Sequence, residues 1–229
     1  SSDLFSVKQR FNLETKKGWE TIQERIEFPS EKNKSWIDYV YAKRLEVSCG
    51  EAPYLTSRYD TVTGEYLPVA DRIGLLDRKL RVINENTANT EDWLKWAYIA
   101  VTSVYGFDWQ GDNVLIAREN ILFDIAEYYG YKFDKQITAQ DLIGFAEVII
   151  WNIWQMDGLK YVVPDSCCMQ EKKEVTLFEE VITSSVCEGC KGGNHLKHNG
   201  IYCNIKDWDT HHIIRFVDLL EKNKKNGSV

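Results

Sequence analysis

The feature that most constrains the fold is a short apolar segment that carries an acidic residue and breaks into a turn of small residues. It reads Leu-Glu-Val-Ser-Cys-Gly-Glu-Ala-Pro-Tyr-Leu and covers residues 45–55. Small residues in such a turn let a ligand approach the backbone N–H groups closely. We therefore expect a strand over residues 44–48 that leads into a ligand-binding turn, the alternative being an ordinary buried strand. The residues assigned to this site are Glu46, Cys49, Gly50, Ala52 and Tyr54.

A second strand followed by a helix is predicted near the middle of the chain. Residues 105–109 read Tyr-Gly-Phe-Asp-Trp, and an Ala-Arg-Glu-Asn segment follows at residues 117–120. A carboxylate at the end of a strand of a nucleotide-binding sheet can accept hydrogen bonds from ribose hydroxyls. Asp108 is the candidate for this role.

Three segments in order resemble the motifs of the gamma-class N6-adenine DNA methyltransferases. Residues 45–55 are similar to the first motif, L-E-P-x-C-(G/A)-x-G-x-(F/Y)-L, but Val47 replaces the proline and Ala52 the second glycine. Residues 106–121 resemble the second motif, which pairs G-x-(D/E) with a later A-R-x-N-L. The third motif is matched by Asn-Ile-Trp-Gln-Met-Asp-Gly-Leu at residues 152–159, although an Asp-Gly pair at a strand end is usually only a turn.

The resemblance implies that S-adenosyl-L-methionine (AdoMet) is the cofactor, and it assigns a role to each site residue. Glu46 and the turn at residues 50–52 are expected to hold the methionine part. Asp108 is expected to hold the ribose, Trp109 the face of the adenine, and Asp157 the adenine amino group.

The fold class implied is α/β, a Rossmann-like AdoMet-dependent methyltransferase sheet with a small C-terminal zinc-binding appendage. We expect an irregular N-terminal segment at 1–34, the AdoMet-binding domain at 35–162, and the appendage with a C-terminal helix at 163–229. A hairpin at 58–68 and an extra helix would fill the long interval between the first two motifs, which exceeds the roughly 30 residues of a minimal strand-helix-strand unit. Further helices are predicted at 73–83, after Asn89, at 138–150 and at 213–220.

Five of the six cysteines lie after residue 165, where their spacing indicates a metal site. A Cys-x-x-Cys pair can place two thiolates on one tetrahedral zinc ion, and four protein ligands would make the site structural. Residues 169–186 look like a loose excursion between the two halves of the site. The predicted zinc ligands are Cys167, Cys187, Cys190 and Cys203, with Cys168 or His198 as alternatives to Cys167.

The chain has four prolines and no Pro-Pro pair, so it lacks the (N/D/S)-P-P-(Y/F/W) catalytic loop of the family. The resemblance therefore implies one half of a split enzyme of a restriction-modification or related defence system. A second polypeptide would carry the catalytic loop and the target-recognition region, and this chain alone would be inactive. A net charge of −7 indicates that DNA is bound mostly by that partner. The sequence has no long apolar run or signal peptide, and we expect a cytoplasmic protein without membrane contact.

Two other functions compete with this interpretation. The first is a non-catalytic interaction or regulatory module on a degenerate methyltransferase scaffold, which Ala52 and the long interval favour. The second is a zinc-dependent nuclease that uses His195, His198 and Asn199, which requires an open metal coordination position and a basic groove.

Overall fold

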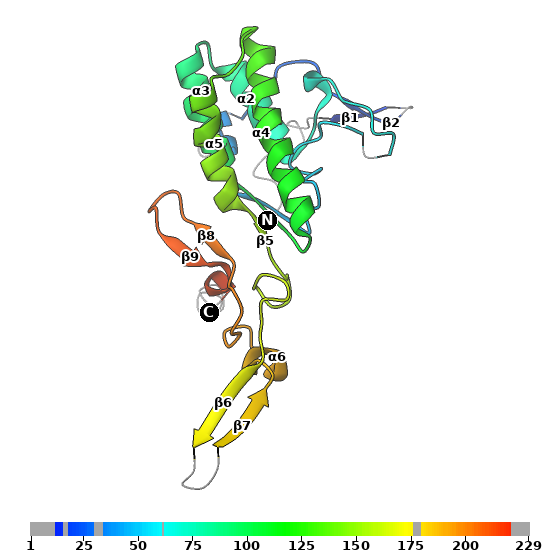
Figure 1. Ribbon diagram of the computed structural model, residues 1–229. Helices are drawn as coiled ribbons and strands as arrows, with labels where there is room; N and C mark the ends of the chain where they lie inside the picture. Colours follow the sequence, from blue (N-terminus) through cyan, green and yellow to red (C-terminus); the bar gives the residue numbers. More distant parts are fainter. Residues whose placement is uncertain (1–11, 16–17, 30–33, 61, 176–179, 221–229) are drawn as a thin grey trace.

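The computed structural model describes residues 12–15, 18–29, 34–60, 62–175 and 180–220 (Figure 1). A three-stranded parallel sheet forms the centre of the protein. Its strands are β3 (Arg44–Val47), β4 (Val104–Asp108) and β5 (Ile153–Gln155), in the spatial order β3-β4-β5. All neighbours run parallel, with Glu46 opposite Gly106 and Gly106 opposite Ile153. The carboxyl ends of the three strands therefore meet at one edge of the sheet, and the first two strands begin and end close to their predicted positions.

Five helices begin where the sequence supplies caps or small residues. They are α1 (Trp36–Tyr41), α2 (Leu75–Asn86), α3 (Thr90–Thr102), α4 (Gly111–Phe133) and α5 (Ala139–Asn152). Ser35, Asn89 and Thr138 each accept a hydrogen bond from a backbone N–H in the first turn of α1, α3 and α5. The helices α2 to α5 contact one another and gather at one end of the molecule (Figure 1).

The main hydrophobic core fills the space between these helices and the inner face of the sheet. Trp93, Leu76, Leu80 and Ile121 are fully buried there, and the ring of Trp93 packs edge-on against Tyr129. The helical spacing of the apolar residues thus predicted core positions correctly. A second, smaller cluster lies around Phe107, whose side chain follows the opposite alternation of β4.

The other face of the sheet faces a hairpin of β8 (Asn204–Lys206) and β9 (Ile213–Arg215). The helix predicted to begin at residue 213 starts only after Arg215, because Ile213–Arg215 pairs with β8 instead. A pattern of apolar residues over so few positions fits a strand as well as a helix, so periodicity alone could not distinguish the two structures.

Two further hairpins occupy segments for which no regular structure was predicted. In the N-terminal segment, β1 (Asn12–Thr15) pairs with β2 (Gly18–Thr21). In place of the loose excursion, β6 (Gln170–Val175) pairs with β7 (Glu180–Ser185), and this hairpin lies at the far end from the helices (Figure 1). Antiparallel pairing uses backbone groups, which a polar composition does not reveal.

Smaller elements complete the described chain. The hairpin expected at 58–68 is reduced to a single antiparallel bridge between Tyr59 and Tyr66, and a 3₁₀ turn, η2 (Val69–Asp71), follows it. The short helix α6 (Glu188–Gly192) follows Cys187 and contains Cys190. Residues 1–11 of the expected irregular segment and the C-terminal tail from 221 lie outside the described residues. No helix in the described part of the chain is long and apolar enough to cross a bilayer.

Candidate cofactor site and metal centre

The turn after β3 is tightly wound and lies at the carboxyl edge of the sheet. Ser48, Gly50 and Ala52 all have left-handed backbone angles, with φ of 57°, 54° and 64°. This conformation suits Gly50 but is uncommon for residues with a side chain, and such strain concentrates at functional sites. The side chain of Ala52 is fully buried, so the turn is anchored in the core.

The carboxylate of Asp108 ties this turn to the next strand and helix. Its Oδ2 atom accepts a hydrogen bond of 2.8 Å from the N–H of Gly50. Its Oδ1 atom accepts one of 2.8 Å from the N–H of Gln110 and one of 3.3 Å from Nδ2 of Asn113, at the start of α4. Asp108 thus lies at the predicted strand end, and it fixes the geometry of the turn.

Glu46 is the second acidic group at this edge. It lies on the same face of the sheet as Asp108, because it pairs with Gly106, two residues before Asp108. Only 7% of the residue is exposed, and its Oε1 atom accepts a 3.4 Å hydrogen bond from the N–H of Tyr54. No donor among the described residues reaches Oε2, which is buried. An unpaired buried acceptor costs about 1–3 kcal/mol, so this atom lacks a hydrogen bond that would stabilise it.

Burial raises the pKa of Glu46 to about 7, and the nearby Asp108 carboxylate adds a smaller upward contribution. The N–H groups of Tyr54 and Leu55 act in the opposite direction. The two carboxyl groups are therefore close enough to influence each other's ionisation.

Cys49 has a packing role beneath the turn. Its thiol is buried and lies where a Cβ atom on Gly106 would be only 3.2 Å away, so this position of β4 favours glycine. Burial raises the pKa of the Cys49 thiol to about 12, with contributions from Glu46 and Asp108. The thiol is therefore neutral at physiological pH, and it is not an activated nucleophile.

Tyr54 and Trp109 expose large aromatic surfaces at the same edge of the sheet. Tyr54 is 74% exposed and Trp109 is 45% exposed. The main chain is fixed at both positions, since the carbonyl of Tyr54 accepts from the N–H of Leu75 and that of Trp109 accepts from Gln155 Nε2. Both rings are available to a planar ligand such as a purine.

Asp157, the third predicted acidic residue, has a local role. Its Oδ1 atom accepts hydrogen bonds of 2.9 Å and 3.1 Å from the N–H groups of Leu159 and Lys160. Its Oδ2 atom lies 3.5 Å from Nζ of Lys160. This carboxylate closes the turn after β5, which is the usual function of an Asp-Gly pair. The structure thus places Glu46 and Asp108 close together, whereas the hydrogen bonds of Asp157 are made within its own turn.

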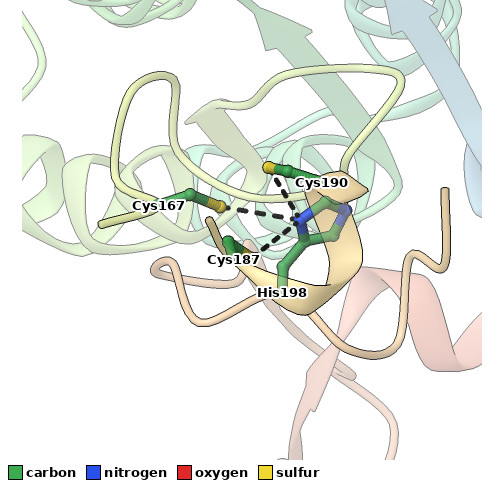
Figure 2. A group of neighbouring side chains, drawn as sticks. All are labelled: Cys167, Cys187, Cys190 and His198. Carbon is green, nitrogen blue, oxygen red and sulfur yellow. Dashed lines mark hydrogen bonds between the residues drawn. The ribbon is translucent and has the colours of Figure 1, made fainter. Parts of the chain in front are cut away.

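A separate group of three cysteines and one histidine could hold a metal ion (Figure 2). Its members are Cys167, Cys187, Cys190 and His198, and their ligand atoms lie within 4.8 Å of one another. The three Sγ atoms are 3.6, 3.7 and 3.6 Å from Nδ1 of His198. Zinc bonds of about 2.3 Å to sulfur and 2.1 Å to nitrogen in a tetrahedron separate S and N by about 3.6 Å. The spacing therefore fits zinc.

The backbone around this group is shaped to hold it. Cys187 caps α6, and a Cβ atom on Gly189 would lie 2.7 Å from both the backbone N and Nδ1 of His198, so a larger residue would displace this ligand. The N–H of Asn199 donates to Cys187 Sγ at 3.3 Å. The hydroxyl of Tyr202 accepts from the N–H of His198 at 2.9 Å. Such supporting contacts orient the ligands of a metal site.

The Cys187 thiol has a lowered pKa, which favours the thiolate form that metal ions bind. Burial alone would raise its pKa, but hydrogen bonds from the backbone N–H groups of Cys190 and Asn199, and from His198, lower the pKa to about 6. By contrast, burial and the neighbouring thiols raise the pKa of Cys167 to about 11. A metal ion would favour the thiolate form of both groups.

Cys203, predicted as a ligand, lies outside this group, and His198 takes its place. Cys203 is fully buried in the apolar cluster with Phe107, and burial raises its pKa far above the usual range. Cys203 points away from the cysteine–histidine group because side chains alternate along an extended segment. Tyr202 pairs with Val162, and Cys203, the next residue, faces the opposite side. His198, the eighth residue after Cys190, was predicted only as an alternative to Cys167.

The remaining polar residues near this group are not part of the ligand set. Cys168 is exposed, and its carbonyl accepts a 2.9 Å hydrogen bond from Asn199 Nδ2. The ring of His195 packs edge-on against Tyr161. Four protein ligands leave no open coordination position, which argues against the nuclease interpretation and for a structural site.

Comparison of the chain with protein-family models, curated proteins and solved structures finds no match.

Proposed function

We propose that this chain is the AdoMet-binding subunit of a DNA adenine-N6 methyltransferase of a restriction-modification or related defence system. The observation that carries the proposal is the buried Oε2 atom of Glu46, which lacks a partner beside Asp108 at the carboxyl edge of β3 and β4. The carboxyl edge of a parallel sheet is where α/β folds bind nucleotides. The mixed α/β architecture, with helices against the inner face of consecutive parallel strands, supports a Rossmann-like domain.

The residues at this edge fit the chemical groups of AdoMet. Glu46 would accept from the α-ammonium group, and the two neighbouring carboxylates would attract its positive charge. Asp108 would accept from the ribose hydroxyls with its remaining lone pairs. Trp109 offers an aromatic face to the adenine. Bound AdoMet supplies an activated methyl group, and the task of these side chains is to hold it in a fixed orientation.

The proposal assigns the catalytic loop to a second chain, since residues 1–229 contain no (N/D/S)-P-P-(Y/F/W) loop. In such a loop, a polar side chain and a backbone carbonyl hold the target amine while an aromatic ring stacks on the flipped base. We therefore expect no methyl transfer by this chain alone. The net charge of −7 is consistent with DNA contacts that come mostly from the partner.

The metal centre has a structural role in this proposal. A zinc ion held by Cys167, Cys187, Cys190 and His198 would stabilise the lobe after β5 without touching the reacting groups. Methyl transfer itself needs no metal ion.

The test has two parts. The chain is first titrated with AdoMet by calorimetry, and it is then co-expressed with the product of a neighbouring gene that carries the catalytic loop. Transfer of labelled methyl groups to DNA by the pair, but by neither chain alone, is the expected result. Loss of AdoMet binding in both the single chain and the pair would rule the proposal out.

A regulatory module on a degenerate scaffold is the second candidate, and one observation favours it. The Asp108 carboxylate already accepts hydrogen bonds from Gly50, Gln110 and Asn113. If those contacts prevent ribose binding, the chain would interact with the partner but would not bind AdoMet.

A further inference from the structure

We propose that Asn199 is the positioning residue of the metal centre and that it couples metal binding to the formation of the β6–β7 hairpin. The hairpin then forms stably only in the metal-bound chain, so metal binding acts as a conformational switch for this element. None of the residues concerned belongs to the proposed cofactor site, so this coupling goes beyond the proposed function and does not depend on AdoMet.

Two of the metal ligands flank the hairpin in the sequence. Cys167 lies just before β6 (Gln170–Val175), and Cys187 lies just after β7 (Glu180–Ser185). Their Sγ atoms belong to the group whose ligand atoms all lie within 4.8 Å of one another (Figure 2). An ion bound to both side chains therefore closes the base of the hairpin, as a cross-link closes a loop.

The hairpin has little other support in the described part of the chain. Its two strands pair with each other from Gln170 and Ser185 to Val175 and Glu180. No other described helix or strand makes more than marginal contact with them, and the hairpin extends away from the helices (Figure 1). A two-stranded hairpin by itself is marginally stable at best in water. Its stability should therefore depend on how firmly its base is held.

Asn199 holds the main chain where it enters the hairpin. Its Oδ1 atom accepts a 3.3 Å hydrogen bond from the N–H of Cys168, and its Nδ2 atom donates a 2.9 Å hydrogen bond to the carbonyl of the same residue. A carboxamide carries an acceptor beside its donors, so it can satisfy both main-chain groups of one residue. Cys168 lies between the ligand Cys167 and β6, so these two hydrogen bonds fix the entry to the hairpin.

Asn199 also contacts the chain that leaves the hairpin. Its backbone N–H donates to Sγ of Cys187 at 3.3 Å, and it directly follows the ligand His198. One residue thus joins the chain that enters β6, the first ligand after β7 and the histidine ligand.

The segment after Asn199 packs closely against the entry to the hairpin. A Cβ atom on Gly200 would lie 2.5 Å from Oγ of Ser166 and 3.0 Å from Sγ of Cys167, so a larger residue would push the two segments apart. The N–H of Ile201 donates to Oγ of Ser166 at 3.0 Å. These contacts keep the side chain of Asn199 opposite Cys168.

The coupling should act in both directions. Metal binding fixes Cys187 and His198, which holds Asn199 against Cys168 and so favours the pairing of β6 with β7. Removal of the Asn199 amide frees the entry segment, so Cys167 is less well placed to bind the ion. Thermodynamic linkage requires the two effects to have the same coupling free energy. If Asn199 only filled a turn, its loss would change neither property.

The first experiment measures how metal binding affects the hairpin in the full wild-type chain. Amide hydrogen exchange of peptides from 170–175 and 180–185 is followed by mass spectrometry in zinc-loaded protein and in protein stripped of metal by a chelator, both without AdoMet. Zinc should slow exchange in both strands by about tenfold or more, whereas exchange in α4 stays the same. Equal exchange of the hairpin in both samples, or faster exchange in α4 as well, would overturn the proposal.

The second experiment compares Asn199→Ala with the matched control Asn194→Ala. Asn194 is an exposed residue of the same loop, and its Oδ1 atom accepts from the N–H of Leu196. Cobalt(II) affinity is read from the absorption bands of the bound ion, which report its ligands directly. Asn199→Ala should bind cobalt(II) about 10–100-fold more weakly and show about tenfold faster hairpin exchange at saturating zinc, whereas Asn194→Ala should match the wild type.

Wild-type values of either property in Asn199→Ala, or equal losses in both variants, would contradict the coupling. Exchange in α4 checks that each variant is folded. If Asn199→Ala is not folded, Asn199→Asp replaces it, because aspartate keeps the acceptor for the N–H of Cys168 and loses the donor to its carbonyl. AdoMet titration of the same proteins tests the proposed function separately, so a failure of one proposal is distinguished from a failure of the other.

Discussion

The Asp108 carboxylate accepts a 2.8 Å hydrogen bond from the backbone N–H of Gly50, so the end of β4 fixes the left-handed turn that follows β3. The same carboxylate accepts from Gln110 just before α4. One side chain therefore couples the turn, the strand and the longest helix of the described chain.

Removal of this carboxylate should loosen the turn and lower stability. We expect Asp108→Ala to reduce the free energy of unfolding by about 1–3 kcal/mol, because it leaves backbone N–H groups without their acceptor. Urea denaturation followed by circular dichroism measures the change. Asp112→Ala, at an exposed position in the first turn of α4, is the control and should cost less than about 1 kcal/mol. Equal losses for both variants would show that Asp108 does not fix the turn.

The metal centre predicts different outcomes for two exposed cysteines. Cys190→Ser should abolish the binding of one zinc ion per chain, whereas Cys168→Ser should retain it, because Cys168 lies outside the ligand group. His198→Cys should also retain zinc, since four thiolates are an accepted ligand set. Elemental analysis of the purified chain gives the zinc content. If His198→Ala kept its zinc and Cys203→Ser lost it, Cys203 would be the fourth ligand, as predicted from the sequence, and His198 would not.

A buried pair of carboxyl groups between α2 and α4 should make the stability of the fold fall as pH rises. Asp77 and Asp124 are fully buried neighbours, Oδ1 of Asp77 and Oδ2 of Asp124 have no donor among the described residues, and burial raises the pKa of both. One proton shared between these two oxygens would satisfy both. A raised pKa means that the folded chain holds a proton that the unfolded chain releases, so stability falls as pH rises through the folded pKa. Melting temperatures of the wild-type chain should therefore decline as pH rises above the ordinary pKa of aspartate, about 4.

Two substitutions of Asp77 separate this effect from simple packing. Asp77→Asn supplies a permanent N–H donor to Asp124 and keeps an acceptor for the N–H groups of Ser57 and Gly74. It should hold its stability at high pH. Asp77→Ala leaves these groups unpaired and should cost about 3 kcal/mol or more. A decline of stability with rising pH that is unchanged in Asp77→Asn would exclude the shared proton.

The parts of the fold that could be predicted from the sequence are those encoded locally. The caps Asn89 and Thr138 and the apolar spacing of residues 73–83 defined helices because both signals lie within a few turns. The β6–β7 hairpin was missed because its pairing is made by the backbone. Cys203 was wrongly predicted as a ligand, because its position depends on which way a side chain points after a turn, and spacing does not encode that direction. Asp157 forms the turn that an Asp-Gly pair usually makes, and its role toward a cofactor stays a prediction.

Ionisation of Glu46 should lower the stability of the free chain at neutral and alkaline pH. Burial raises the pKa of Glu46 from 4.5 to about 7, so its carboxyl contribution to stability is complete below about pH 4.5 and is lost as pH rises through 7. Glu46→Gln should therefore stabilise the free chain at pH 8 by about 3 kcal/mol. Urea denaturation at pH 5 and pH 8 measures this, with Glu119→Gln on the exposed side of α4 as the control. A gain that is the same at both pH values would not come from the titration of Glu46.

The most direct measurement is calorimetric titration of AdoMet into the wild-type chain, Glu46→Gln and Glu119→Gln at pH 6.0 and pH 7.4. Ionised Glu46 would pair with the ligand's ammonium group, so wild-type and Glu119→Gln affinity should rise several-fold between these pH values. Glu46→Gln should bind at least tenfold more weakly at pH 7.4 and lose the pH dependence. Wild-type affinity in Glu46→Gln, or no AdoMet binding by any of the three proteins, would contradict the account.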